Sequence, residues 1–238
     1  MDNQAWLEVD GVTIFRNRKP VLVDLTFKIP NAVQRLYIVG PSGVGKTTLL
    51  HTISGFLLSY DGRIFLDKER VTRPTGTAPI VFQDQSLWNW MTALENVRFS
   101  IQSSRRIKNV TREQCLVFLD KVRIAHKADA YPLTMSIGEQ QRLSIARAIS
   151  AEPKHLFLDE PFSALDPSNQ KGILQDIQEW LQLPTRSMIM VSHNIHQATQ
   201  EAEMILHLQN AHEFKLFDLR EMTVKQKRQL LKLLEGDE

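Results

Sequence analysis

The segment GPSGVGKTT, residues 40–48, constrains this chain more than any other feature, because it fits the pattern G-x-x-x-x-G-K-[S/T]. Backbone N–H groups of such a loop surround phosphate oxygens, and its glycines permit the positive φ and close approach that a side chain would block. The apolar residues 36–39 before it indicate a buried strand, and residues 47–54 indicate a helix that ends at Gly55. A strand, a glycine loop and a helix in this order predict a nucleotide-binding site.

The loop also has to supply positive charge. The partial charge at a helix N-terminus contributes at most about 2 kcal/mol, which cannot hold a triphosphate alone. We expect Lys46 to bring a full charge to the β- and γ-phosphates and the Thr47 hydroxyl to bind Mg²⁺. A glycine turn that merely precedes a helix is the alternative, and chance gives this pattern in about one such chain in a hundred. The predicted nucleotide-binding residues of the loop are Gly40, Pro41, Ser42, Gly43, Val44, Gly45, Lys46, Thr47 and Thr48.

Composition excludes several classes of protein. Among 238 residues, 29 are lysine or arginine and 27 are aspartate or glutamate, a near balance that argues against nucleic acid as an obligatory partner. The single cysteine, Cys115, excludes an internal disulfide, and its apolar neighbours predict a core thiol. No apolar run approaches the roughly 18 residues of a membrane span, and residues 1–4 do not begin a secretory signal. We therefore expect a cytosolic protein that reaches a membrane only through a partner.

Hydrophobic periodicity predicts an α/β fold. Strands are expected at residues 6–9, 12–15, 21–29, 63–66, 79–82, 156–158 and 187–191. Helices are expected at residues 92–99, 111–125 and 139–150, followed by a hairpin of 204–208 with 213–217 and a final amphipathic helix at 224–234. Strands that alternate with helices after a phosphate-binding loop indicate a mostly parallel sheet covered on both faces, with the central helical block inserted between strands.

Two further segments could complete a catalytic site. Residues 156–160, LFLDE, end an apolar strand with two carboxylates, and side chains alternate along an extended chain. Asp159 can therefore face a metal ion while Glu160 faces an attacking water, a role typically worth 10²–10⁴ in rate. In the second segment, Ser136 and Glu139 match a capping box, which needs no functional explanation; alternatively, this capped helix end with Gly138 could hold a second phosphate.

Taken in order, these motifs resemble those of an ATP-binding-cassette (ABC) ATPase over nearly the whole chain. Residues 40–48 match the Walker A motif, and residues 156–160 match the Walker B motif with its catalytic glutamate. The remaining matches are the signature segment 135–142, the D-loop 163–166, the Q-loop Gln83, the switch histidine His193 and an adenine-stacking aromatic at Phe15. For this last role Trp6 is a competing candidate, and Asp166 with Pro167 would also begin a helix well.

The resemblance implies a P-loop NTPase of the ABC fold, with an antiparallel β subdomain and an inserted helical subdomain. It implies ATP and Mg²⁺ as cofactors, and two cassettes that meet head to tail, so that each ATP lies between one Walker A motif and the partner's signature segment. The implied catalytic residues are Lys46, Gln83, Glu160 and His193. The implied metal ligands are Thr47, Gln83 and Asp159. The implied nucleotide contacts beyond the loop are Phe15, Ser136, Gly138 and Asp166.

The signature segment departs from the usual family pattern, because Ile137 stands where the family has no β-branched side chain. If this position required a positive φ or close phosphate approach, isoleucine would be strained there, and we expect hydrolysis that is intact but slow.

Residues 87–97 resemble the nitrate, sulfonate and taurine importer ATPases, in which this stretch borders the groove for a membrane subunit. The resemblance implies uptake of a small solute, with separate transmembrane permease subunits, a substrate-binding protein and a position on the inner face of the cell membrane. Trp88 and Trp90 are expected to contact the permease, or else to pack within the helical insertion. The alternatives are an exporter or lipoprotein-release ATPase, a non-transport ABC ATPase, and a module that binds nucleotide without hydrolysing it.

We expect one domain over 1–238, with a core of 1–85 and 151–238 and a helical subdomain at about 86–150.

Overall fold

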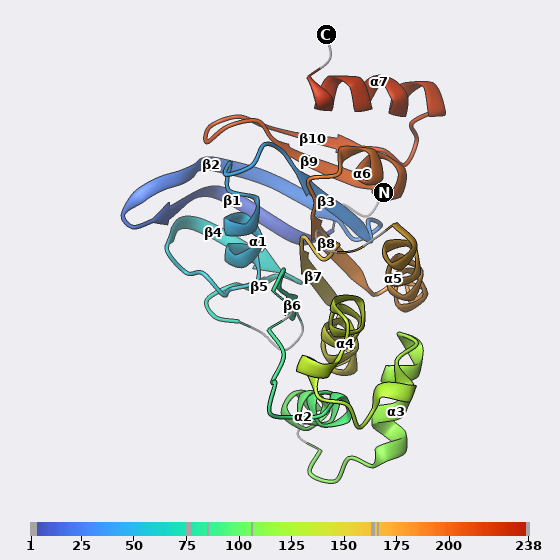
Figure 1. Ribbon diagram of the computed structural model, residues 1–238. Helices are drawn as coiled ribbons and strands as arrows, with labels where there is room; N and C mark the ends of the chain where they lie inside the picture. The colour runs from blue at the N-terminus through green and yellow to red at the C-terminus, as the bar shows by residue number, and fades with distance from the viewer. Residues whose placement is uncertain are drawn as a thin grey trace. The chain divides into compact units, whose positions relative to one another are not determined.

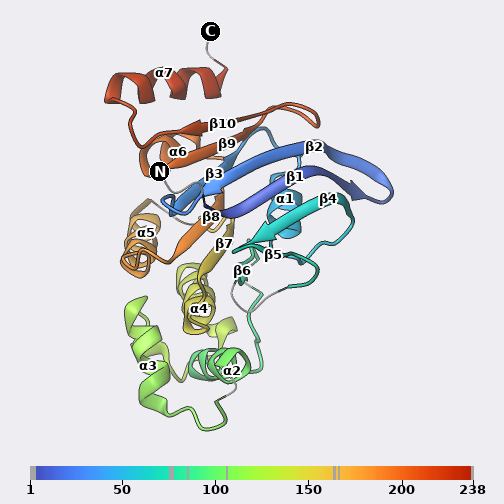
Figure 2. The same ribbon diagram turned by 180° about the vertical axis from the view of Figure 1, so that it is seen from behind.

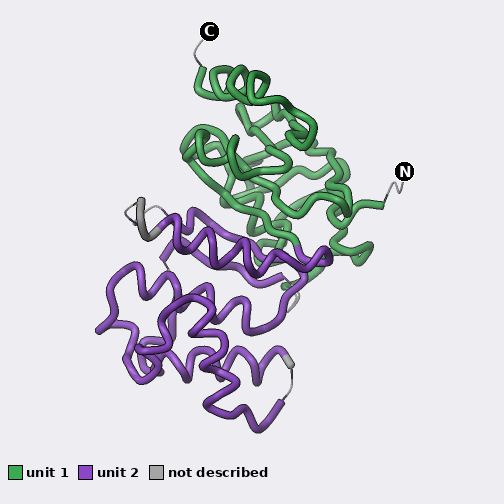
Figure 3. Tube along the Cα trace, turned by 90° about the vertical axis from the view of Figure 1, so that its right-hand side faces the viewer, with its two compact units in different colours: residues 1–75, 187–238 green, residues 76–186 purple. Residues whose placement is uncertain are grey.

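The computed structural model describes residues 4–74, 78–84, 86–105, 107–162, 165 and 167–236. The chain divides into two compact units, which Figure 3 shows in different colours. Unit 1 consists of Met1–Thr75 and Ser187–Glu238, and unit 2 consists of Gly76–Arg186. The boundary assigns residues 151–186 to the same unit as the helical segment. The expected division into core and helical subdomain remains a prediction.

Unit 1 begins with an antiparallel sheet in the strand order β2-β1-β4-β5 (Figure 1). Its strands are β1 (Ala5–Arg16), β2 (Lys19–Pro30), β4 (Tyr60–Leu66) and β5 (Glu69–Arg70). The strands expected at 6–9 and 12–15 are one strand, because the register shift between Val9 and Val12 bends β1 at Gly11 (φ 56°) without ending it. Asn17 and Arg18 both have positive φ, which is the backbone that a two-residue hairpin turn requires.

The second sheet of unit 1 contains strands in the order β10-β9-β3-β8. They are β3 (Arg35–Val39), β8 (Ser187–Val191), β9 (Met204–Leu208) and β10 (Phe214–Asp218). β3 pairs in parallel with β8 and β9, while β10 closes the predicted hairpin with β9. Every residue of β8 and β9 is buried, as expected for strands covered on both faces.

Helices α1, α6 and α7 accompany these sheets in unit 1 (Figures 1 and 2). Helix α1 (Lys46–Ile53) contacts β8 of the parallel sheet and both β1 and β4 of the antiparallel sheet. Helix α6 (Ile195–Glu201) contacts β3, and α7 (Val224–Glu235) contacts α6. Because α1 follows the glycine loop directly and is held by strands of both sheets, its N-terminus has a fixed place at the end of β3.

Unit 2 contains four helices and a pair of parallel strands among its described residues. The helices are α2 (Ala93–Arg105), α3 (Arg112–Lys121), α4 (Ile137–Ser150) and α5 (Pro167–Trp180), with short 3-10 turns η1 (Ala125–Lys127) and η2 (Pro132–Thr134). Helix α4 contacts α2, α3 and α5, and Cys115 is buried as predicted. The strands β6 (Ile80–Val81) and β7 (His155–Asp159) pair in parallel. The predicted α/β fold, with parallel and antiparallel sheets, is confirmed.

Candidate nucleotide-binding site

The glycine loop adopts a backbone that only glycine accommodates easily. Gly40, Gly43 and Gly45 have φ of 148°, 79° and 113°, in the region that L-residues rarely adopt. A Cβ on Gly40 would overlap the carbonyl oxygen of Leu208 on β9, and one on Gly45 would lie 3.0 Å from Cγ1 of Val21. The loop is therefore built for close backbone approach, both to its own protein and to a ligand on its open side.

Lys46 is the first residue of α1 and is buried. Its Nζ donates hydrogen bonds of 2.9 Å to the carbonyl oxygens of Gly40 and Pro41, so the ammonium group lies within the loop itself. The next residue, Thr47, is exposed, whereas Thr48 is buried. The first turn of α1 contains no acidic residue that would cancel the partial positive charge of its N-terminus. Positive φ glycines, a helix N-terminus and a lysine in one loop fit a bound phosphate.

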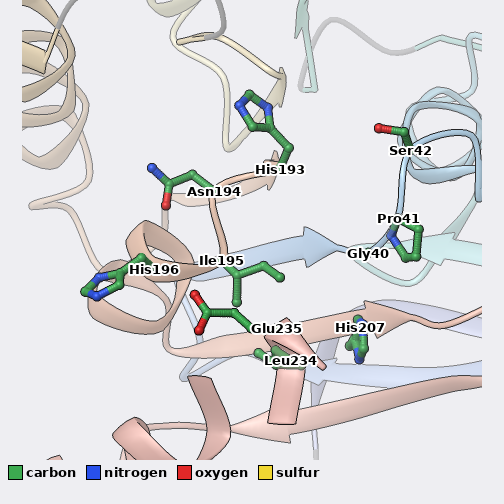
Figure 4. Close-up of a pocket in the computed structure, with 10 residues that line it drawn as sticks. All are labelled: Gly40, Pro41, Ser42, His193, Asn194, Ile195, His196, His207, Leu234 and Glu235. Carbon is green, nitrogen blue, oxygen red and sulfur yellow. The ribbon is translucent and has the colours of Figure 1, made fainter. Parts of the chain in front are cut away.

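A pocket of about 540 Å³ lies beside the glycine loop within unit 1 (Figure 4). Its lining residues are Gly40, Pro41, Ser42, His193, Asn194, Ile195, His196, His207, Leu234 and Glu235. The predicted His193 thus faces the same pocket as the predicted loop residues. Its position follows from β8, which ends at Val191, and from Asn194, whose side chain accepts a hydrogen bond of 2.9 Å from the N–H of Gln197 and begins α6.

Several residues of this pocket had no signal in the sequence. His207 lies on β9, and Leu234 and Glu235 belong to the last turn of α7. They meet the loop only because β9 pairs with β3 and α7 packs against α6. Burial, together with the charge of Lys215, holds the pKa of His207 below its usual range.

The two predicted carboxylates end β7 in unit 2. Asp159 is buried and Glu160 is half-buried, with a φ of 45° that is unusual for a residue with a side chain. β6 pairs with β7 in parallel, with Val81 opposite Leu158. Gln83 lies two residues after Val81, and Glu160 lies two residues after Leu158. The carboxyl ends of parallel strands meet at one edge of a sheet. Unit 2 therefore brings Gln83, Asp159 and Glu160 to the same edge.

The signature segment forms the N-terminus of α4. Ser136 is the N-cap, its Oγ accepts from the N–H of Glu139 at 3.3 Å, and the Glu139 carboxylate accepts from the N–H of Ser136 at 2.8 Å. The predicted capping box is therefore confirmed. Ile137 is exposed and is the first helical residue, followed by the half-buried Gly138. The strain expected from a positive φ is wrong, because Ile137 has the right-handed helical backbone that suits isoleucine, whereas the effects on phosphate approach and on the hydrolysis rate stay predictions. Asp166, Ser163 and Ala164 lie outside the described residues.

The two aromatic candidates for adenine have different surroundings. Trp6 is 4% exposed, and its Nε1 donates a hydrogen bond of 2.9 Å to the carbonyl oxygen of Val33. Trp6 is therefore a core residue, and the hypothesis that it stacks on adenine is wrong. Phe15 is half-buried near the end of β1, opposite Pro20 of β2. Of the two, only Phe15 is partly exposed, and its contact with adenine stays a prediction.

The two tryptophans before α2 also differ. Trp88 packs its ring edge-on against Phe99 with centroids 4.5 Å apart, and the Arg147 guanidinium lies 4.9 Å from its ring centre. Asn96 is buried, accepts from the N–H of Trp88 and donates to its carbonyl oxygen. Trp90 is 72% exposed. The alternative of packing within the helical segment is thus correct for Trp88, while Trp90 remains open to a partner.

Comparison with known proteins agrees with this geometry. The family model described as ABC transporter matches residues 22–163. The taurine import ATP-binding protein TauB of Yersinia pestis bv. Antiqua is 33% identical over 200 residues, which cover 84% of this chain and 78% of TauB. The nitrate import ATP-binding protein NrtC of Synechococcus elongatus is 32% identical over 200 residues, 83% of this chain and 30% of NrtC.

A solved structure supports the fold. The dimeric post-hydrolysis state of the ATP-binding cassette MJ0796, bound to ADP and Pi, has a TM-score of 0.78 and 24% identity, and the match covers 91% of this chain and 100% of that one. In the described part of this chain, no helix combines the length and the apolar character of a membrane span. The family match and the identity to TauB together place the chain in the ABC transporter family, as an ATP-binding cassette ATPase.

Proposed function

We propose that this ATPase powers the uptake of a small solute through separate membrane subunits. The observation that carries the hydrolytic part of the proposal is the pocket of unit 1, which the glycine loop and His193 line together. Phosphoryl transfer needs a set of donors around the terminal phosphate, and a P-loop with a histidine on its open side supplies such donors.

ATP would lie along the loop of residues 40–48, with the β- and γ-phosphates at the N-terminus of α1. The Nζ of Lys46 now donates to two loop carbonyls, and it would turn to the phosphates when nucleotide binds. Phe15 would stack on the adenine. Mg²⁺ prefers hard oxygen ligands, and the side-chain oxygens of Thr47, Gln83 and Asp159 would supply them. The ion would neutralise negative charge on the phosphates.

Glu160 would hold and polarise the attacking water, and His193 and Lys46 would stabilise charge on the γ-phosphate. The left-handed φ of Glu160 supports this role, since strained backbone in a side-chain residue is concentrated at functional sites. Ser136 and Gly138, at the N-terminus of α4, would complete the site of a second copy bound head to tail, and Asp166 would contact that copy.

The named relatives support an importer. TauB is named for taurine import and NrtC for nitrate import. By analogy, this chain would bind permease subunits at the inner face of the cell membrane, together with a substrate-binding protein that delivers the solute. The exposed Trp90 would contact the permease.

Phosphate release from Mg-ATP by the purified protein tests the hydrolytic role. Because a general base is typically worth 10²–10⁴ in rate, Glu160→Gln should lower the turnover number by about a hundredfold or more while nucleotide affinity is retained. Glu113→Gln, an exposed glutamate on α3 of the same unit, is the matched control and should keep the wild-type rate. Equal rates for the wild type and Glu160→Gln would contradict the assignment, as would a wild type that binds ATP and releases no phosphate.

A further inference from the structure

Asp176 is a buried carboxylate on α5 that the site described above does not use. Its side chain is 2% exposed and is held by two arginines from other segments of unit 2. Nη1 of Arg142, on α4, lies 2.5 Å from Oδ2, and Nε of Arg123, which follows α3, lies 3.3 Å from Oδ1. One carboxylate thus connects three segments: the end of α3, helix α4 and helix α5.

Space for the Arg142 guanidinium is made by a glycine on α5. Gly172 lies one helical turn before Asp176, on the same face of the helix. A Cβ at Gly172 would lie 2.5 Å from Nη2 of Arg142, so any side chain there would displace the guanidinium. Gly172 has no positive φ, and α5 gains nothing from a glycine in its interior, which costs about 0.5–1 kcal/mol relative to alanine.

Arg142 belongs to the helix that Ser136 caps. Nη1 of Arg142 also donates to the carbonyl oxygen of Val122 at 3.2 Å, so α4 is fixed both to α5 and to the end of α3. Arg123 itself has a φ of 61°, a backbone that a side-chain residue adopts only when its surroundings require it. The arrangement fixes where the N-terminus of α4 lies within unit 2.

Stability alone does not explain such a pair. Replacing a buried ion pair with packed apolar residues is often neutral or stabilising, because desolvation opposes the attraction between the charges. A buried pair with a glycine opposite it instead specifies one arrangement of the helices. It does so in the helix whose first turn is expected to contact nucleotide.

We propose that Asp176, Arg142 and Gly172 are positioning residues for the signature end of α4. They hold Ser136 and Gly138 in the orientation that meets the nucleotide of a second copy. This inference rests on the proposed head-to-tail dimer. None of the three residues contacts the nucleotide; Asp176 and Gly172 act through Arg142, and Arg142 acts through α4.

ATP-driven association of the full chain tests the inference. The Glu160→Gln background is used because it should slow turnover, and sedimentation velocity measures dimer formation with saturating ATP. Gly172→Ala retains both charged groups and should raise the dimer dissociation constant by about tenfold or more, equivalent to about 1.4 kcal/mol, because the added methyl group displaces the Arg142 guanidinium. Asp176→Asn should do the same. In both variants the affinity of the monomer for a fluorescent ATP analogue should equal that of the background, because the glycine loop belongs to unit 1.

Ile177→Val is the matched control, since it removes a methylene from a buried residue on the same helix and should leave dimer formation unchanged. Unchanged association of Gly172→Ala and Asp176→Asn would overturn the inference and leave the proposed function intact. A parallel loss of monomer nucleotide affinity would overturn it as well, by indicating general damage to the fold. A Glu160→Gln background that binds ATP and stays monomeric would overturn both proposals.

Discussion

The glycines of the loop differ in what an added side chain would contact at each position. Gly43 has a φ of 79° and open space where a Cβ would lie, whereas at Gly40 the carbonyl of Leu208 occupies that space. At Gly43 the cost of a side chain is backbone strain alone. At Gly40 strain and a steric overlap with β9 act together.

Gly40→Ala should therefore lower the free energy of unfolding by about 2 kcal/mol or more, while Gly43→Ala should lower it by about 1 kcal/mol. Urea denaturation of the two variants measures the difference. Equal losses would mean that β9 yields to the added methyl group and that the close approach at Gly40 is not a constraint.

Glu139 carries the electrostatic part of the α4 cap. The hydrogen bond from the N–H of Ser136 is the main cause that holds its pKa below the usual range, burial acts in the opposite direction, and Lys127, with Nζ at 3.3 Å, lowers the pKa further. A carboxylate with a lowered folded-state pKa stabilises the fold above its unfolded pKa and loses that contribution as the pH falls through the folded value.

Wild-type stability should thus decline below about pH 4.3, the ordinary pKa of glutamate, partly because Glu139 becomes protonated. Glu139→Gln keeps the capping geometry without the titration. Its stability relative to wild type should improve as the pH is lowered from 6 to 3, measured by urea denaturation at each pH. A stability difference that is constant with pH would show that Glu139 does not titrate differently in the two states.

Among the elements, the loop before α2 shows how one segment serves two purposes. The side-chain amide of Asn96, on α2, accepts a hydrogen bond from the N–H of Trp88 and donates one to its carbonyl oxygen, so the loop has a defined backbone conformation. The ring of Trp88 packs against Phe99 and Arg147, whereas Trp90, two residues further along, is exposed. The loop is therefore packed against the helices through Trp88 and exposes Trp90 to solvent.

Trp88→Ala should destabilise the protein by about 2–3 kcal/mol, because it removes an aromatic pair and a cation–π contact. Trp90→Ala should change stability by less than about 0.5 kcal/mol and should spare ATP hydrolysis by the purified chain. Thermal denaturation and phosphate release measure both. If the proposed importer role is correct, Trp90→Ala should weaken co-purification with the permease; retention of full assembly would place the docking surface elsewhere.

In the whole molecule, the predicted site residues fall into the two units. The glycine loop, Phe15 and His193 belong to unit 1, and Gln83, Ser136, Asp159 and Glu160 belong to unit 2. Within unit 1, the glycine loop and His193 line one pocket. Within unit 2, Gln83, Asp159 and Glu160 lie at the carboxyl edge of β6 and β7. Under the proposed mechanism, turnover of ATP would require the residues of both units, so catalysis would depend on the whole chain.

The sequence by itself determined the α/β class, the phosphate-binding loop and the cap of α4, since each depends on residues close together in the chain. Backbone conformation, helix capping and strand burial follow from local spacing. Only the tertiary structure showed that Trp6 is a core residue, because the partner of its indole is Val33, 27 residues away. Tertiary contacts also separate Trp88, which is packed, from Trp90, which is exposed, and they bring Gly172 next to Arg142. The physical reason is that these contacts join segments far apart in the sequence, so the spacing of residues along the chain does not predict them.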